Sequence, residues 1–467
     1  MEHKINTLGQ LKLSGWQSTS IRNEIRKNVI QKIQQGLPLL EGLHGYEDSV
    51  VPQLEAALLA GHDVIFLGER GQGKSRIIRS LVSLMDEWVP CIAGSEVNDD
   101  PYHPMSNFAK RIVTEMGDET PIAWVHRDNR FGEKLATPDT SVADLIGDVD
   151  PIKVAEGRYL SDEATLHFGM IPRTNRGVFA INELPDLSER IQVGLLSILE
   201  ERDVQIRGYR ISLPLDIFLV ASANPEDYTN RGRLITPLKD RFGSQIRTHY
   251  PFSNEIELAI VDQEAIRHEN LPIDVYVPQY MREVVASVSA LARNSVAINQ
   301  KSGVSVRATV SNYEALSAAA LRRALRGGDE LAVVRVSDFW VLESSMAGKV
   351  ELESIDDSDE FAVIEKLIAK AMLDVFRSLA PYEELKPLIQ HFDLGLEISV
   401  GDDSSDAALI KLLDIEPLAK TVERIEPRQE PGAKVALIEF ILEGLHLSKK
   451  LNKYESDFGA IYIRHPR

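Results

Sequence analysis

The sequence is poor in cysteine and has no long hydrophobic run. Cys91 is the only cysteine among 467 residues, so no disulfide can form within one chain. A lone cysteine is typical of a reducing compartment, and we expect it to act as a small buried hydrophobic residue. No apolar run approaches the roughly 18 residues of a membrane helix, and the first residues lack the apolar core of a secretory signal. These features predict a cytoplasmic protein without a membrane span.

An excess of basic residues is also lacking. The chain carries 52 Lys and Arg against 71 Asp and Glu, a formal net charge of −19. Broad binding of duplex nucleic acid needs basic side chains against the phosphates. We therefore do not expect nucleic acid as a partner, although a narrow basic channel inside a ring of subunits is compatible with this charge.

Short apolar runs alternate with helical patterns between residues 41 and 251. The clearest runs are "DVIFLG" at 63–68, "GVFAINEL" at 177–184 and "IFLVASAN" at 217–224. Continuous apolar runs of this length are typical of strands that are buried on both faces of a parallel sheet. The sequence therefore predicts an α/β fold, with a parallel sheet in a three-layer core over residues 41–251.

The flanking segments carry helical patterns. Apolar residues at helical spacing predict an N-terminal helical arm in residues 1–40, and three further patterns predict an all-helical domain in residues 252–350. The stretch "ELESIDDSDE" at 351–360 places six carboxylates in ten residues, which indicates a solvated linker or a helix start. Residues 351–467 are accordingly predicted to form an acidic linker and a C-terminal extension.

A phosphate-binding loop follows the first apolar run. The stretch "GERGQGKS" fits the pattern G-x-x-x-x-G-K-[ST] between a predicted strand and a predicted helix. In such a loop the backbone N–H groups wrap the phosphates, the lysine reaches the β- and γ-phosphates, and the serine binds Mg²⁺. No N-K-x-D motif accompanies the loop, which disfavours a GTPase. The predicted nucleotide-binding residues are Gly68, Glu69, Arg70, Gly71, Gln72, Gly73, Lys74 and Ser75, of which Ser75 is also a predicted metal ligand.

A second motif ends the run at 177–184. P-loop enzymes usually place an Asp at the end of such a strand to help hold Mg²⁺, and many follow it with a Glu that polarises water. This chain has Asn182 followed by Glu183. Glu183 is therefore the candidate catalytic base. Asn182 keeps an oxygen that can face the metal but lacks the negative charge, so we expect weakened Mg²⁺ binding.

Two interpretations follow from Asn182. The chain hydrolyses its nucleotide with a weakened affinity for Mg²⁺, or it is a slow or silent switch that binds the nucleotide and hydrolyses little. The sequence leaves both open.

Several segments together carry a family resemblance. They include "GYEDSV" at 45–50, "RTNRGVFAINELPDL" at 173–187, "VASANPED" at 220–227, "RLITPLKDRFG" at 233–243 and "VSVRATVSNYEAL" at 304–316. In this order they resemble the AAA+ ATPases, specifically the magnesium-chelatase ATPase-subunit (ChlI/BchI-like) family, with the MoxR-type ATPases as near relatives. The resemblance covers about residues 40 to 345 and implies ATP and Mg²⁺ as cofactors.

The resemblance also implies roles for single residues. Asn224 matches sensor 1, which orients the attacking water and contacts the γ-phosphate. Arg307 matches sensor 2, which closes a helical lid over the phosphates, so residues 252–350 would form that lid. Tyr46 matches the segment that packs near the adenine base. Residues 150–176 resemble an insertion that lines the pore of a ring, and His167 within them is not expected to bind metal.

An arginine finger is the last implied feature. Arg241 matches the arginine that reaches the ATP of the neighbouring subunit, with Arg231 or Arg233 as substitutes nearby. A guanidinium suits this task because its charge is permanent and its donors form a planar fork. A finger supplied by a neighbour implies a ring, with a hexamer as the expected size.

The resemblance implies an ATPase that hydrolyses ATP in a ring to remodel or activate a partner protein. The activity would be magnesium-chelatase-subunit-I-like or that of a MoxR-like chaperone, with a partner that carries a von Willebrand factor A domain. The alternative is a nucleotide-gated scaffold or switch with little hydrolysis. A transcriptional activator is disfavoured because no GAFTGA-like loop occurs, and a helicase is disfavoured by the acidic charge.

Overall fold

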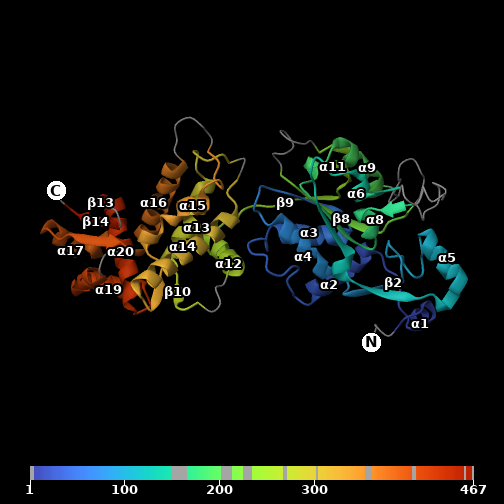
Figure 1. The fold of residues 1–467 in the computed structure, drawn as a ribbon, viewed down its shortest axis with the longest axis horizontal. Coiled ribbons are helices and arrows are strands. Elements are labelled where there is room, and N and C mark those ends of the chain that lie inside the picture. Colours follow the sequence, from blue (N-terminus) through green and yellow to red (C-terminus); the bar gives the residue numbers. More distant parts are fainter. Residues whose placement is uncertain are drawn as a thin grey trace. The chain divides into compact units, whose positions relative to one another are not determined.

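The computed structural model describes residues 5–149, 166–200, 213–224, 234–266, 271–300, 303–352, 360–401, 406–456 and 459–464. The chain forms two compact units, an N-terminal unit of residues 1–249 and a C-terminal unit of residues 250–467. In Figure 1 the N-terminal unit runs from blue to green and the C-terminal unit from yellow to red.

The N-terminal unit is built on a five-stranded sheet in which every neighbouring pair is parallel. All residues of the three inner strands are buried, which explains their continuous apolar sequences. The predicted α/β P-loop fold with a parallel sheet is thereby confirmed. In spatial order the strands are β4 (Phe131–Leu135), β7 (Gly177–Asn182), β8 (Ile217–Ala223), β1 (Val64–Leu67) and β9 (Ser244–Arg247).

Helices cover both faces of this sheet (Figure 1). Val64 and Phe66 of β1 pack in one hydrophobic cluster, and Ile65 and Leu67 pack in the other, as the alternation of side chains along a strand requires. The unit therefore has three layers. The Val64 face is covered by α2 (Ile21–Gln34), α3 (Val50–Ala60) and α4 (Lys74–Ser80), and the Ile65 face by α6 (Val142–Leu145), α8 (Met170–Arg173), α9 (Glu189–Glu200) and α11 (Thr236–Arg241).

An antiparallel hairpin is inserted between α4 and β4. Its strands, β2 (Trp88–Ile92) and β3 (Ile122–His126), flank the helix α5 (Asn107–Met116). The chain's start lies along this insertion, because the backbone N–H of Leu8 donates to the Thr120 carbonyl and that of Ile122 to the Asn6 carbonyl, both at 2.9 Å. Shorter elements of the unit are α1 (Leu8–Leu13), β5 (Gly147–Val149), β6 (Leu166–Phe168) and the 3₁₀ turns at Leu81–Leu84, Gly117–Glu119, Arg127–Arg130 and Leu184–Asp186.

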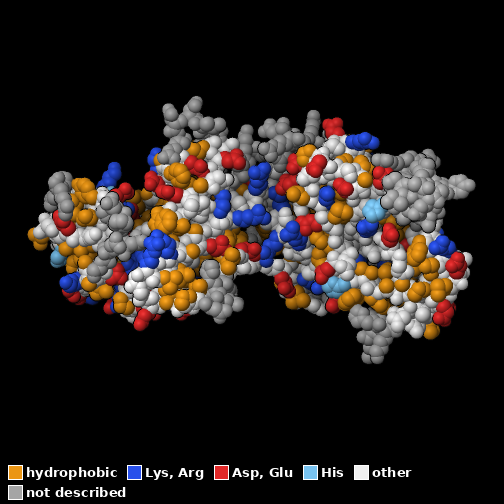
Figure 2. All heavy atoms as spheres, in the orientation of Figure 1, with side chains coloured by type: hydrophobic (Ala, Val, Ile, Leu, Met, Phe, Trp, Pro, Cys, Tyr) orange, Lys and Arg blue, Asp and Glu red, His pale blue; other side chains and the backbone are white. Residues whose placement is uncertain are grey.

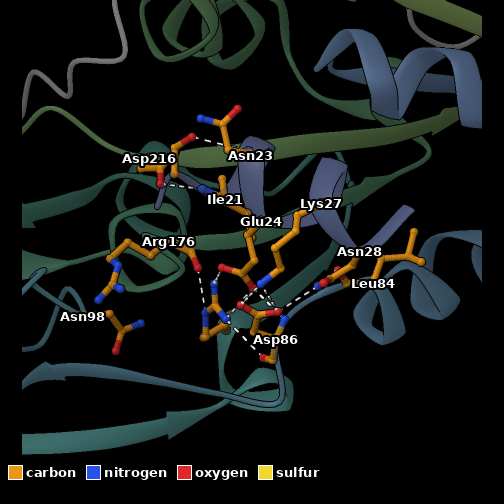
Figure 3. A network of polar contacts seen from close by, with 12 residues as sticks. Ile21, Asn23, Glu24, Lys27, Asn28, Leu84, Asp86, Asn98, Arg176 and Asp216 are labelled. Atoms are coloured by element: carbon orange, nitrogen blue, oxygen red, sulfur yellow. Dashed lines mark hydrogen bonds and ion pairs between the residues drawn. The ribbon is translucent and has the colours of Figure 1, made fainter. Parts of the chain in front are cut away.

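A buried ion pair fixes α2 to the core. The two terminal nitrogens of Arg130 donate to the two carboxylate oxygens of Glu24, at 2.9 and 2.7 Å. Both side chains are almost fully buried, and a Glu24 oxygen also accepts from the backbone N–H of Asp86 at 2.7 Å. Figure 3 shows Glu24, Lys27 and Asn28 of α2 directed toward Asp86. Helix α2 is thus anchored by specific polar contacts as well as by apolar packing.

In its described residues, the C-terminal unit is mainly helical and packs around one hydrophobic cluster. That cluster joins the helices that precede residue 350 to those that follow it, so the two parts share one core. The helices are α12 (Asn254–Glu264), α13 (Gln279–Arg293), α14 (Val306–Gly327), α15 (Val341–Met346), α16 (Glu360–Leu379), α17 (Tyr382–Asp393), α18 (Asp406–Ile410), α19 (Glu416–Ile425) and α20 (Pro431–Leu447).

The described part of the C-terminal unit also contains two small sheets. The parallel pair β10 (Asp274–Tyr276) and β11 (Leu331–Val333) forms one, and an antiparallel sheet in the order β12-β14-β13 forms the other. The strands of the second sheet are β12 (Ile398–Gly401), β13 (Asn452–Ser456) and β14 (Gly459–Ile463). The sequence predicted four segments, with boundaries at 40, 251 and 350. This division into four parts stays a prediction.

The surface mixes charged and apolar side chains. Figure 2 shows acidic side chains lying among basic and hydrophobic ones on the drawn face of each unit. Single large hydrophobic side chains are exposed in both units, with Leu13 at 90% and Leu394 at 87%. Within the residues that the structure describes, no helix is both long and apolar enough to cross a membrane.

Candidate functional site

The loop between β1 and α4 has the backbone that a phosphate-binding loop requires. Gly71 and Gly73 have φ angles of 75° and 71°, in the left-handed region where glycine carries no steric penalty. A Cβ atom on Gly68 would lie 1.9 Å from the hydroxyl of Thr248 and 2.2 Å from the amide oxygen of Gln72. Glycine at 68 therefore allows β9 and the loop to approach each other closely.

Lys74 places its charge inside this loop. The side chain is 7% exposed, and its ammonium group donates to the carbonyl oxygens of Gly68 and, at 2.7 Å, of Glu69. A buried ammonium needs such partners because its desolvation is costly. The charge is thus held within the loop whose pattern is typical of phosphate binding. Ser75 follows as the second residue of α4 and is partly exposed.

Tyr46 contacts the backbone of the phosphate-binding loop through its hydroxyl. Its hydroxyl lies 2.5 Å from the carbonyl oxygen of Gln72 and 2.9 Å from that of His249, so it can donate to either. Burial raises the pKa of the Tyr46 phenol well above its usual value, which keeps it a donor. The hydroxyl of Thr248 donates to the side-chain oxygen of Gln72 at 2.7 Å. Tyr46 therefore contacts the loop backbone, and contact with an adenine base stays a prediction.

Asn182 and Glu183 lie at the carboxyl end of β7, next to the end of β8. Asn182 donates from its amide nitrogen to a Glu133 oxygen at 2.6 Å and accepts from the Ser222 hydroxyl at 3.1 Å. The backbone N–H of Glu183 donates to the same hydroxyl at 3.2 Å. Glu183 has a φ angle of 53°, which is uncommon outside glycine and is often found at functional sites.

The parallel sheet brings these groups together at the carboxyl ends of its strands. Strands β7, β8 and β1 are consecutive neighbours, so their carboxyl ends and the loops that follow them lie side by side. This edge carries the phosphate-binding loop, Asn182, Glu183 and Asn224, which follows β8 and is 5% exposed. In parallel α/β folds ligands bind at this edge of the sheet.

Glu133 was not predicted as a site residue, although it contacts Asn182. It lies on β4, an edge strand whose residues are partly buried or exposed and whose sequence "FGEKL" has no continuous apolar run. Its second oxygen accepts from Arg79 of α4 at 2.8 Å. The sequence offers no signal for this role, because the contact depends on how β4 pairs with β7.

The predicted arginines have different positions. Arg241 is the last residue of α11 and is exposed, with one terminal nitrogen 3.4 Å from the Pro237 carbonyl oxygen. Arg307 is the second residue of α14 in the C-terminal unit and is also exposed. Arg231 and Arg233 lie outside the described residues, as does most of the predicted insertion at 150–176. The roles predicted for these arginines stay predictions.

Known proteins show the same resemblance, but the sequence similarity covers only part of this chain. No family model matches the sequence. Magnesium-chelatase subunit ChlI-1 of Arabidopsis thaliana is 28% identical over 214 residues, which is 45% of this chain and 47% of that protein. Magnesium-chelatase subunit ChlI of Anabaena variabilis is 28% identical over 222 residues, 46% of this chain and 62% of that protein. The chain thus spans about half the length of the curated relatives it matches.

One chain from a model of the complex between subunits BchI and BchD of magnesium chelatase, based on a single-particle cryo-EM reconstruction, is similar at 19% identity, covering 70% of this chain and 97% of that chain, with a TM-score of 0.35. The sequence relatives and the parallel sheet with its loop at the end of β1 agree with the motifs. The chain is therefore similar to the ChlI subunits of magnesium chelatase, as its motifs predicted.

Proposed function

We propose that this chain is an AAA+ ATPase, which binds ATP with Mg²⁺ at the edge of the sheet formed by β7, β8 and β1 and hydrolyses it. The observation that carries this proposal is the buried ammonium of Lys74 inside the glycine loop, which follows β1 at the same end of the sheet where Glu183 follows β7. A charge in a loop of that backbone suits the phosphates of a nucleotide. ATP is preferred over GTP because the sequence resembles ATPases and lacks an N-K-x-D motif.

The residues at this edge fit a nucleotide with its metal. Gly68 leaves no room for a side chain, and Lys74 would exchange its carbonyl partners for phosphate oxygens. Ser75 and Asn182 would hold Mg²⁺, which neutralises charge on the phosphates when it is bound. Tyr46 would keep the loop in its binding conformation and lie near the base.

Hydrolysis needs a group that accepts a proton from water. Glu183 is the carboxylate at the end of β7 and would act as this base, while Asn224 would orient the water. Arg241 would be supplied by a neighbouring subunit, which is consistent with its exposure on α11. Arg307 would contact the phosphates from the helical lid.

A ring of subunits, proposed as a hexamer, follows from an arginine finger that acts on a neighbour's ATP. The similarity to magnesium-chelatase subunits supports remodelling or activation of a partner protein, in a chelatase-like or MoxR-like chaperone role. We propose that the partner carries a von Willebrand factor A domain. The lone buried cysteine supports a reducing, cytoplasmic location.

A nucleotide-gated scaffold is the second candidate, and it is favoured by Asn182. The amide of Asn182 is held on both sides, by Glu133 and Ser222, at the position where P-loop enzymes usually have an Asp. Steady-state ATP hydrolysis at saturating Mg²⁺, compared between wild type and Glu183→Gln with ATP binding measured on the same samples, separates the two. Turnover by wild type but not by the variant supports the ATPase, and binding without turnover in both supports the scaffold.

A further inference from the structure

Glu133 bridges two elements of the candidate site. One of its carboxylate oxygens accepts from the Asn182 amide at 2.6 Å, and the other accepts from Arg79 at 2.8 Å. The Glu133 side chain is 20% exposed, while that of Arg79 is 66% exposed. A partly buried carboxylate therefore touches the residue that stands where a metal-binding Asp is usual.

The fold places this carboxylate near the expected metal. Strand β4 pairs with β7 in parallel, and Leu135 lies opposite Asn182, so Glu133 is two residues from the carboxyl edge. Arg79 and Ser75 are four residues apart on α4 and therefore share a face of that helix. Arg79, which holds Glu133, lies one helical turn after Ser75 on α4.

The hydrogen bonds also set the orientation of Asn182. Its amide nitrogen is directed to Glu133, so its oxygen is directed to Ser222 at the other side. An Asp at 182 could not donate to Glu133. Two carboxylates at the observed 2.6 Å would instead repel each other. Glu133 therefore favours an amide over an ionised acid at 182.

We propose that Glu133 provides the negative charge that Asn182 lacks, so that an amide on β7 and a carboxylate on β4 together take the place of the usual Asp beside Mg²⁺. This inference rests on the proposed binding of ATP with Mg²⁺. Glu133 is a positioning residue, because it acts through Asn182 and through its charge. It explains how the chain retains a charge at the metal despite its altered motif.

Mg²⁺-dependent nucleotide affinity tests this role without measuring turnover. A fluorescent, non-hydrolysable ATP analogue is titrated into the full chain at increasing Mg²⁺ concentrations, for wild type and Glu133→Gln. We expect the variant to need about threefold to tenfold more Mg²⁺ for half-maximal affinity, because one partly exposed negative charge is lost. The affinity of the variant for the nucleotide analogue without Mg²⁺ should equal that of wild type. The contacts of Glu133 are with Asn182 and Arg79, outside the phosphate-binding loop.

Three further variants distinguish charge from structure. Asn182→Asp alone should not lower the Mg²⁺ requirement, whereas the exchanged pair Asn182→Asp with Glu133→Gln should return it to the wild-type value. Arg79→Gln should lower the requirement about twofold, because a positive charge next to Glu133 is removed. The matched control is Asp118→Asn, whose carboxylate is 66% exposed and pairs with Lys12, and it should leave the titration unchanged.

The outcomes separate this inference from the proposed function. A Glu133→Gln chain that titrates with Mg²⁺ as wild type does, while both bind the nucleotide, overturns the role of Glu133 and leaves the ATP site standing. A wild-type chain that does not bind the analogue at any Mg²⁺ concentration overturns both. Recovery in the exchanged pair rules out misfolding as the cause of the single-variant effect, and failure to recover contradicts the charge exchange.

Discussion

The ammonium nitrogen of Lys74 lies 2.7 Å from the carbonyl oxygen of Glu69, within the loop that joins β1 to α4. The loop therefore holds the charge at the place where phosphates would need it. Lys74→Ala removes this charge, and we expect ATP affinity to fall by about a hundredfold or more. Fluorescence titration with a labelled ATP measures the loss.

Lys12→Ala is the control for Lys74, because Lys12 is exposed and pairs with Asp118 on the surface. Its ATP affinity should equal that of wild type. Undiminished affinity in Lys74→Ala would contradict the assignment of the phosphate-binding loop.

Tyr46→Phe tests the support of the loop. The change leaves the carbonyl oxygens of Gln72 and His249 without the Tyr46 donor, and we expect a loss of about 1 kcal/mol in the free energy of unfolding. ATP affinity should fall severalfold, because the Gln72 carbonyl belongs to the loop. Tyr102→Phe is the control, since Tyr102 lies in the insertion between α4 and β4 and its hydroxyl donates to the Trp16 carbonyl, not to the loop.

The high pKa of Tyr46 adds a pH dependence. The phenol loses its proton at a higher pH in the folded than in the unfolded chain. Its contribution to the free energy of unfolding is therefore complete below about pH 10 and is lost as the pH rises further. Urea unfolding between pH 9 and about 11 should therefore show a steeper loss of stability in wild type than in Tyr46→Phe. Equal slopes would mean that the hydroxyl is not held as the structure shows.

The inner strands of the sheet could be predicted from the sequence, whereas its edges could not. β1, β7 and β8 are buried on both faces and so have continuous apolar sequences. β4 and β9 are partly exposed, and their sequences "FGEKL" and "SQIR" have no such run. A strand has a continuous apolar sequence only when both of its faces are buried, so the sequence of an edge strand gives little indication of a strand.

The same distinction applies to the candidate site. The glycine loop, Asn182 and Glu183 are consecutive in sequence or follow a buried strand, so their pattern is visible. Glu133 reaches Asn182 across 49 positions and only through the pairing of β4 with β7. Contacts of that kind depend on tertiary structure, which local sequence patterns do not contain.

Subunit mixing tests Arg241. Arg241→Ala and Glu183→Gln should each lower ATP hydrolysis about a thousandfold, because each active site would then lack its finger or its base. In an equal mixture about one quarter of the interfaces would combine an intact Glu183 with an intact Arg241, so activity should return to roughly that fraction. A coupled assay of phosphate release measures it.

Lys239→Ala on the same helix as Arg241 is the control and should keep wild-type hydrolysis. The absence of rescue in the mixture would argue against a site shared between subunits. Full ATP hydrolysis by Arg241→Ala would mean that Arg231 or Arg233, and not Arg241, is the arginine finger.

Glu24→Gln tests the anchoring of α2. The variant leaves the buried guanidinium of Arg130 without its carboxylate, and breaking such a pair costs about 3 kcal/mol or more. The midpoint of urea unfolding of the N-terminal unit should fall accordingly. Lys27→Ala breaks the exposed pair with Asp86 and is expected to change stability by less than about 1 kcal/mol. Equal effects in the two variants would contradict the buried ion pair.

The single cysteine provides a test of packing beneath the inserted hairpin. Cys91 lies on β2 and is 4% exposed, and burial raises the pKa of its thiol to about 11, against a smaller opposing effect of Arg176. At pH 8 only about one thiol in a thousand would be ionised, and the thiolate is the reactive form. A disulfide reagent should therefore label native protein slowly and label one thiol per chain after unfolding in guanidinium.

Substitutions at Cys91 separate burial from reactivity. Cys91→Ala should cost about 1 kcal/mol of stability, as for a small buried hydrophobic group. Cys91→Ser should cost more, by about 1–3 kcal/mol, because it places a stronger hydrogen-bonding group in a site shaped for sulfur. Rapid labelling of the native thiol would instead show that β2 separates from the core, and the serine variant would then be no less stable than the alanine variant. The ranking of the two variants and the labelling rate must therefore agree if the thiol is packed as the structure shows.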